Sequence, residues 1–141
     1  MEAAAPDTRL WLDLKGPRRQ LAHHALEVVG QRGAITVSSK CWWLLGRLTG
    51  EPGVRTLRSA GNRFELFLLL WLPTRSKVDG AVVHRRLLDD RVIEKLRSRG
   101  LVFTWGVEDA DTIDWLRGRQ VDGVILDDLS LAPPRQSGWL G

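Results

Sequence analysis

Two oppositely charged residues stand two positions apart at the end of an apolar run, the Asp and Lys of LWLDLK. Alternation along a β-strand would put the three leucines on one face and Asp13 and Lys15 on the other. A charge held away from water is costly unless it is paired or bound to a metal. The spacing therefore predicts an inward-facing pair, either a structural ion pair or part of a functional site.

A second polar pair, His84 and Arg85, follows the apolar run that begins at Gly80. Both side chains can contact a phosphate group, so both are candidate substrate-binding residues. Neighbouring residues of a strand point to opposite faces. At most one of the two can therefore face a ligand if both belong to the strand.

The elements that must position these residues alternate between strands and helices. Strand-like runs cover residues 10–15, 34–39, 54–59, 80–84, 101–107 and 123–127, and five helix-like segments lie between them. This order predicts parallel strands joined by right-handed crossovers. The first strand–helix junction, DLKGPRRQ, lacks the Gly-rich pattern of nucleotide-binding sheets. The alternative is a (β/α) barrel, whose chemistry lies at the C-terminal ends of its strands.

Three local patterns sharpen this expectation. Pro17 is expected to open the first helix, because proline suits the first helical position. The run FELFLLLWLP at 64–73 is too short to span a bilayer, which takes about 20 residues, and predicts a buried helix. The tripeptide Val-Asp-Gly stands before an apolar run at both 78–80 and 121–123, which predicts one structural position used twice.

Composition favours one ordinary folded domain over residues 1–141, with a short tail at 133–141. The chain has 21 basic and 17 acidic residues, a net charge of +4, and a scattered distribution of basic residues that argues against nucleic acid. The single cysteine, Cys41, fits a reducing compartment. The N-terminus lacks the pattern of a signal peptide, so we expect a cytoplasmic location and no membrane span.

Four segments, LWLDLKG, VSSKCWWLL, GLVFTWGVED and QVDGVILDD, resemble in order the motifs of the glycerophosphodiester phosphodiesterases. That family belongs to the phospholipase-C-like (β/α) barrel superfamily. The resemblance implies hydrolysis of a small glycerophosphodiester to glycerol 3-phosphate and an alcohol, with Mg²⁺ or Ca²⁺ as cofactor. It also implies roles for three residues: Asp13 as a metal ligand, Lys15 as the catalytic lysine, and Trp105 as a residue of the substrate mouth.

The chain departs from this family at its beginning. The family's His-Arg-Gly motif, its Glu-x-Asp metal pair and its second catalytic histidine come before the matching region, and nothing precedes residue 10 to supply them. Six strands also fall two short of the eight of a complete barrel. We therefore expect an α/β fold that is an incomplete TIM-type barrel lacking its first two βα units, with little or no turnover.

Two interpretations of that departure stay open. The chain is either the C-terminal part of a longer enzyme or a homologue that no longer catalyses. In the second case it would act as a binding or assembly module. The open edges of its parallel strands would then favour self-association, because unpaired strand edges invite pairing with another chain.

Overall fold

The computed structural model describes residues 10–71 and 77–132. The chain divides into two compact units, one formed by residues 1–58 and 74–79, the other by residues 59–73 and 80–141. The predicted tail, 133–141, lies outside the described residues, and the single partial domain over 1–141 stays a prediction.

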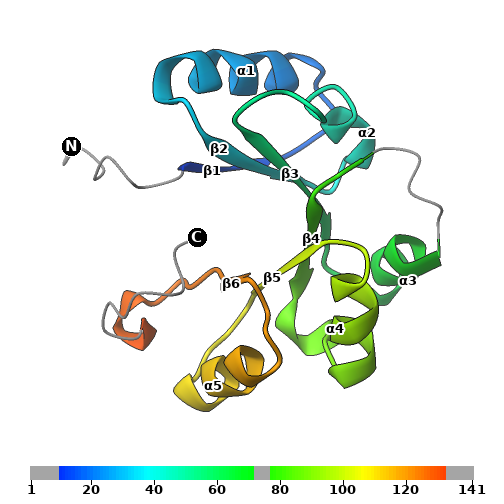
Figure 1. Ribbon diagram of the computed structural model, residues 1–141, viewed down its shortest axis with the longest axis vertical. Coiled ribbons are helices and arrows are strands. Elements are labelled where there is room, and N and C mark those ends of the chain that lie inside the picture. Colours follow the sequence, from blue (N-terminus) through cyan, green and yellow to red (C-terminus); the bar gives the residue numbers. More distant parts are fainter. Residues whose placement is uncertain (1–9, 72–76, 133–141) are drawn as a thin grey trace. The chain divides into compact units, whose positions relative to one another are not determined.

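Unit 1 is a parallel sheet covered by two helices (Figure 1). Its elements are β1 (Leu10–Leu14), α1 (Gln20–Arg32), β2 (Ile35–Ser39), α2 (Trp42–Leu45) and residues 54–58 of β3 (Val54–Ala60). The strands pair in chain order, with Asp13 opposite Ser38 and Ser38 opposite Leu57. The buried core joins side chains of β1, β2 and the helices: Leu14, Ala22, Ala25, Ile35, Val37, Leu45 and Leu48.

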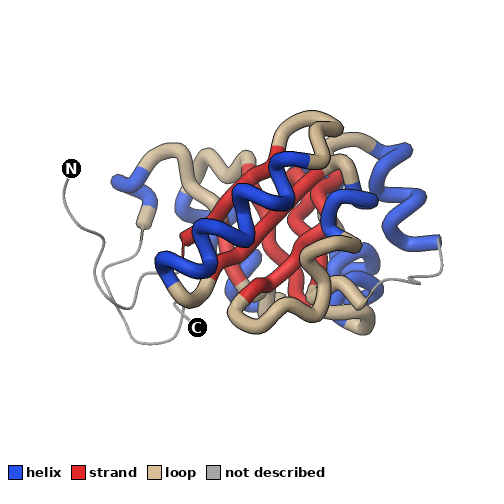
Figure 2. The backbone as a smooth tube through the Cα atoms, turned by 90° about the horizontal axis from the view of Figure 1, so that it is seen from above, coloured by secondary structure: helices blue, strands red, loops and turns tan. Residues whose placement is uncertain are grey.

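Unit 2 repeats the same alternation. Its elements are α3 (Arg63–Trp71), β4 (Gly80–His84), the short 3₁₀ helix η1 (Arg85–Leu87), α4 (Asp90–Arg97), β5 (Leu101–Trp105), α5 (Ala110–Gly118), β6 (Gly123–Val124) and the 3₁₀ helix η2 (Leu129–Leu131). Strands β4, β5 and β6 pair in parallel, and Figure 2 shows helices lying against the strands. Both α4 and α5 are preceded by an N-cap aspartate whose carboxylate accepts a backbone N–H of the first turn, Asp89 from Val92 and Asp109 from Thr112.

The aspartate of the repeated Val-Asp-Gly turn makes the same two backbone hydrogen bonds in each unit. Asp79 bonds the backbone of Thr56 twice, accepting from its N–H at 2.7 Å and donating to its carbonyl at 2.9 Å. Asp122 bonds Val102 in the same two ways, at 2.8 Å and 2.8 Å. The glycine that follows has no room for a side chain: a methyl group on Gly80 would lie 2.1 Å from the carbonyl oxygen of Leu101. The sequence echo is therefore one structural position used twice, as predicted.

The alternation, the six strands and their parallel pairing are confirmed. Helix α1, however, begins at Gln20 and not at Pro17, because a tighter turn precedes it in which the Leu21 N–H donates to Arg18 O at 3.0 Å. Strand β1 ends at Leu14, one residue before Lys15. Strand β6 is also shorter than expected and ends at Val124.

The prediction for residues 64–73 is right about the helix and wrong about its burial. Helix α3 forms, but it buries only Leu66 and Leu69, while Phe64, Phe67 and Trp71 are exposed. The apolar run has a second face that the described residues leave open to water. Among the helices of residues 10–71 and 77–132, none is long and apolar enough to cross a membrane.

Candidate functional site

The C-terminal ends of β1 and β2 carry a charged cluster, which we define as Trp11, Asp13, Lys15 and Ser38. Register places Asp13 beside Ser38 on one face of the sheet. The Ser38 hydroxyl donates to Asp13 Oδ1 at 3.0 Å and accepts from Trp11 Nε1 at 2.9 Å. Ser38 is only 2% exposed, so this chain of hydrogen bonds fixes one oxygen of the carboxylate.

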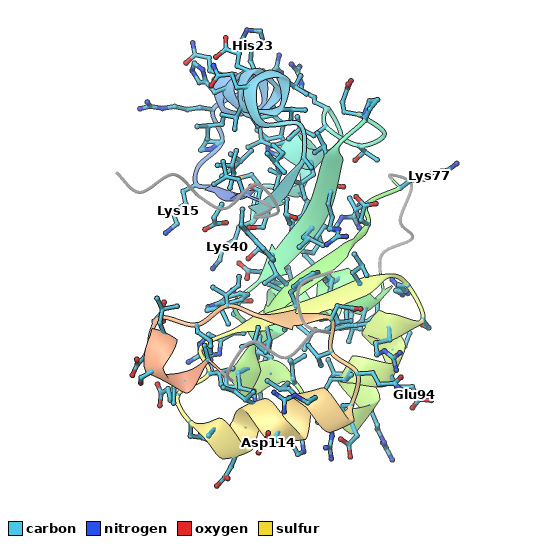
Figure 3. The ribbon with its side chains drawn as sticks, turned by 60° about the vertical axis from the view of Figure 1, so that its left-hand side comes forward. Lys15, His23, Lys40, Lys77, Glu94 and Asp114 are labelled. Atoms are coloured by element: carbon cyan, nitrogen blue, oxygen red, sulfur yellow. The ribbon has the colours of Figure 1, made fainter. Side chains whose placement is uncertain are left out.

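The sequence predicts that Asp13 and Lys15 form an inward-facing pair held away from water. That prediction of burial is wrong. The Lys15 ammonium lies 4.0 Å from Asp13 Oδ2, but the two side chains are 88% and 49% exposed. Lys15 lies beyond the last residue of β1, followed at once by Gly16 with φ +93°. Alternation no longer fixes its direction there, so its charge is solvated by water. Figure 3 shows Lys15 and Lys40 at these strand ends, away from His23 on α1.

Within residues 10–71 and 77–132, the side chains do not form a complete site for a divalent cation. Magnesium and calcium take about six or more oxygen ligands, and no group of three or more Asp, Glu, His or Cys side chains among residues 10–71 and 77–132 is placed to hold a metal. Asp13 alone offers one carboxylate, and its two oxygens already face the Ser38 hydroxyl and the Lys15 ammonium. We therefore derive no chemical step through a metal on these residues.

Unit 2 carries a ring cluster, defined as His84, Trp105 and Gly106, at the ends of β4 and β5. His84 lies opposite Trp105 in the register, and their rings meet edge to face with centroids 5.5 Å apart. Gly106 has φ +76°, and a methyl group there would lie 2.7 Å from His84 Nε2. The imidazole therefore occupies the space that a side chain on residue 106 would need.

Hydrogen bonding orients the imidazole of His84. Its Nδ1 accepts the backbone N–H of Arg86 at 3.2 Å, which leaves the proton of the neutral ring on Nε2. Burial lowers the pKa of His84, the Arg86 charge lowers it further, and Glu108 raises it in part. The lowered pKa favours the neutral imidazole, whose Nε2–H is a hydrogen-bond donor next to Gly106.

Arg85 belongs to a different environment from His84. It lies in η1, beyond the end of β4, and its guanidinium donates to Leu88 O at 3.1 Å and stacks 4.2 Å from the ring centre of Trp115 in α5. This packing gives Arg85 a structural part. Its predicted contact with substrate stays a prediction.

The sequence prediction did not name three residues of these clusters as site residues: Trp11, Ser38 and Gly106. Ser38 orients Asp13, and the signal for it was the strand register, which pairs the two positions once both strands are aligned. Gly106 makes room for His84, and the only signal was a glycine directly after the strand-end tryptophan. The structure brings together Asp13 with Lys15 and His84 with Trp105, each pair within its own unit.

A family model described as the glycerophosphoryl diester phosphodiesterase family matches residues 21–131. The matched range contains His84, Arg85 and Trp105, and it begins after Asp13 and Lys15. None of the curated proteins matches this sequence.

Solved structures show the same fold. A glycerophosphodiester phosphodiesterase from Thermotoga maritima is 20% identical, with a TM-score of 0.69 over 86% of this chain and 55% of its own. An Oleispira antarctica phosphodiesterase, solved in complex with the product sn-glycerol-3-phosphate, is 15% identical, with a TM-score of 0.64 over 84% of this chain and 51% of its own. The chain thus has the TIM-barrel-like α/β fold of these proteins and spans about half of their length.

Proposed function

The chain belongs to the glycerophosphoryl diester phosphodiesterase family, and from that premise we propose that it binds glycerophosphodiesters and glycerol 3-phosphate. The reaction of its family would hydrolyse such a diester to glycerol 3-phosphate and an alcohol. The observation that carries the proposal is the ring cluster, which lies within the matched range and presents a donor and an aromatic face at neighbouring strand ends.

The ring cluster supports binding through two kinds of contact. The Nε2–H of neutral His84 would donate to a phosphate oxygen, a hydrogen bond to an ionised acceptor that is stronger than a neutral one. The Trp105 ring would lie against the glycerol or alcohol carbons. Because Arg86 N–H and Gly106 hold the imidazole in place, little rotamer freedom is lost on binding.

The charged cluster supports a separate contribution. Within unit 1, the exposed ammonium of Lys15 would pair with a negatively charged phosphate group at the end of β1. Asp13 would supply one ligand to a magnesium or calcium ion whose other ligands the described residues do not provide. We therefore propose that this chain by itself has little or no turnover. A cytoplasmic location is also proposed, on the ground of the single cysteine.

Calorimetric titration with sn-glycerol 3-phosphate tests binding. We expect the parent chain to bind. His84→Ala should weaken affinity about tenfold, the value of one charge-assisted hydrogen bond, and Trp105→Ala should weaken it about tenfold through loss of the apolar contact of the ring. Trp43→Ala is the matched control, because Trp43 is 50% exposed on α2 and lies outside both clusters. Absence of binding by the parent, or equal loss in all three variants, would overturn the proposal.

Hydrolysis of glycerophosphocholine, with magnesium or calcium added, tests the proposed lack of turnover. We expect no release of choline above the uncatalysed rate from the parent chain or from Asp13→Ala. Rapid hydrolysis by the parent that Asp13→Ala abolishes would show a working metal site and contradict the proposal.

A non-catalytic assembly role is a second candidate, favoured by the edge of the unit 1 sheet. β1 is the outer strand in the order of the described strands, and Leu10 at its start is 39% exposed. Outer strands carry backbone groups that can pair with another chain. Light scattering after size exclusion distinguishes the candidates: a concentration-dependent dimer supports assembly, and a monomer at all concentrations removes it.

A further inference from the structure

Helix α3 carries an aromatic stripe, which we define as Phe64, Phe67 and Trp71. These residues are spaced by three and four positions, so they share one helix face. Their exposed fractions are 69%, 55% and 65%, and the rings of Phe67 and Trp71 pack 6.0 Å apart. Large apolar groups gathered on one open face, and not scattered singly, are typical of a surface that meets a partner.

Basic side chains border this stripe. Lys95 of α4 places its ammonium 4.1 Å from the ring centre of Trp71, Arg99 donates to Leu69 O at 3.0 Å, and Arg63 begins α3. We call Arg63, Lys95 and Arg99 the basic rim. These contacts place α4 directly beside α3, as Figure 1 also shows.

Acidic side chains of the same helices turn elsewhere. Glu94 and Asp90 of α4 line a hollow of about 450 Å³ with Gly118 and Arg119 near α5, and Asp90 pairs with Arg119. Glu65 of α3 folds back to accept the Gly61 N–H at 2.6 Å. The side of α4 that contacts α3 therefore carries the positive charge of Lys95, and the side near α5 carries both acids, Asp90 and Glu94, together with Arg97 and close to Arg119.

An anionic lipid surface fits this pattern better than a second copy of the chain. A two-fold contact would set the aromatic stripe, and with it the basic rim, against its own image, and like charges would then face one another. Aromatic side chains combined with Lys and Arg are instead the composition of segments that lie in the membrane interface. Basic groups at such a surface are attracted by anionic headgroups.

We propose that the aromatic stripe of α3 docks on the surface of a bilayer that contains anionic lipid. The rings of Phe64, Phe67 and Trp71 enter the boundary between headgroups and acyl chains, and the basic rim lies against the lipid phosphates. The contact is peripheral and uses a helix face that contains no residue of either strand-end cluster. It is independent of the proposed binding of glycerophosphodiesters, because no residue is shared between the two surfaces.

Co-sedimentation of the 141-residue chain with lipid vesicles tests the proposal. The probes are vesicles of phosphatidylcholine alone and vesicles of phosphatidylcholine mixed with phosphatidylglycerol. We expect binding to the mixed vesicles that weakens as salt is raised. The double variant Phe67→Ser, Trp71→Ser should bind at least about tenfold more weakly, because each ring contributes its burial in the interface. Lys95→Gln should weaken binding to the mixed vesicles only.

Leu129→Ser is the matched control, since Leu129 is 80% exposed on η2 and belongs to neither the aromatic stripe nor the basic rim. It should bind like the parent. Failure of the parent to bind either kind of vesicle, or equal binding by the parent and the double variant, would contradict the proposal. A dimer seen by light scattering that Phe67→Ser dissociates would identify a second copy as the occupant. Phe64→Ser and Lys95→Gln keep the test decisive if the double variant misfolds.

Discussion

The charged cluster and the ring cluster occupy equivalent places at strand ends, yet different forces hold them. Asp13 and Lys15 are solvated, and a buried hydroxyl fixes one carboxylate oxygen. His84 is held by a backbone hydrogen bond, by the edge of Trp105 and by the missing side chain of Gly106. Exposed charges tolerate change because water replaces lost partners. A packed ring has no such replacement for its lost contacts. Substitutions should therefore lower the free energy of unfolding more in the ring cluster than in the charged cluster.

The largest effect is expected at Gly106. In Gly106→Ala the new methyl group would meet His84 Nε2 at 2.7 Å, and the residue would keep a φ of +76°. A left-handed conformation costs a non-glycine residue about 1–2 kcal/mol, and overpacking adds about 1–3 kcal/mol. We expect a loss of about 2–5 kcal/mol in the free energy of unfolding, measured by urea denaturation, together with a changed chemical shift of the His84 ring.

Gly118→Ala is the matched control for that experiment. Gly118 ends α5, and a methyl group there would meet nothing within 4 Å. Alanine is the better helix former by up to about 1 kcal/mol, so the free energy of unfolding should stay constant or rise. Equal destabilisation by both alanines would show that His84 does not depend on the space at Gly106, and the contrast between the clusters would fail.

The order of the strands and helices and the parallel pairing of the strands could be predicted from the sequence, because they depend on local patterns. The Val-Asp-Gly pattern that occurs twice in the sequence makes the same hydrogen bonds twice, each time to the backbone of a neighbouring strand. The candidate residues His84 and Trp105 could also be placed at neighbouring strand ends, because parallel strands in chain order bring those ends together. Periodicity and turn chemistry suffice for such features.

The side-chain environment could not be predicted, because it depends on where an element stops and what covers it. Lys15 falls one residue beyond β1, so alternation gave the wrong burial. The run at 64–73 contains almost only apolar residues, and periodicity cannot tell which face of such a helix is covered. The spacing between Gly106 and the His84 ring requires three-dimensional positions that no sequence pattern encodes.

A smaller effect is expected in the charged cluster. Ser38→Ala removes the hydroxyl that joins Trp11 Nε1 to Asp13 Oδ1. Asp13 can rebond to water, so we expect a loss of about 1–2 kcal/mol in the free energy of unfolding, the value of two modest hydrogen bonds. Faster hydrogen exchange at the amides of β1 and β2 would locate the change in unit 1.

Ser98→Ala is the matched control for Ser38→Ala. The Ser98 hydroxyl donates to Lys95 O on the exposed end of α4, so its loss should stay within about 0.5 kcal/mol. A Ser38→Ala effect as small as that of Ser98→Ala would mean that water alone suffices to orient Asp13.

The smallest effect concerns the pH dependence of His84. Burial, with the Arg86 charge, lowers the pKa of this imidazole in the folded state. The unfolded chain therefore binds the proton first as pH falls below the ordinary histidine value of about 6.5, and stability contributed by neutral His84 is lost between that value and the lower folded pKa. Above pH 6.5 this contribution is fully present. An NMR titration of the His84 ring in the folded chain should give a midpoint below the midpoint of the same histidine in the unfolded chain.

Two variants separate the causes of that shift. Arg86→Gln should raise the midpoint of His84, because it removes a positive charge, and Glu108→Gln should lower it, because it removes the group that favours the imidazolium. Burial comes first among the causes, so both changes should be modest and the midpoint of Arg86→Gln should stay below the unfolded value. A midpoint that reaches the unfolded value in Arg86→Gln would assign the shift to charge. The packing around Trp105 and Gly106 would then no longer account for the neutral ring that the ring cluster needs to donate to a phosphate.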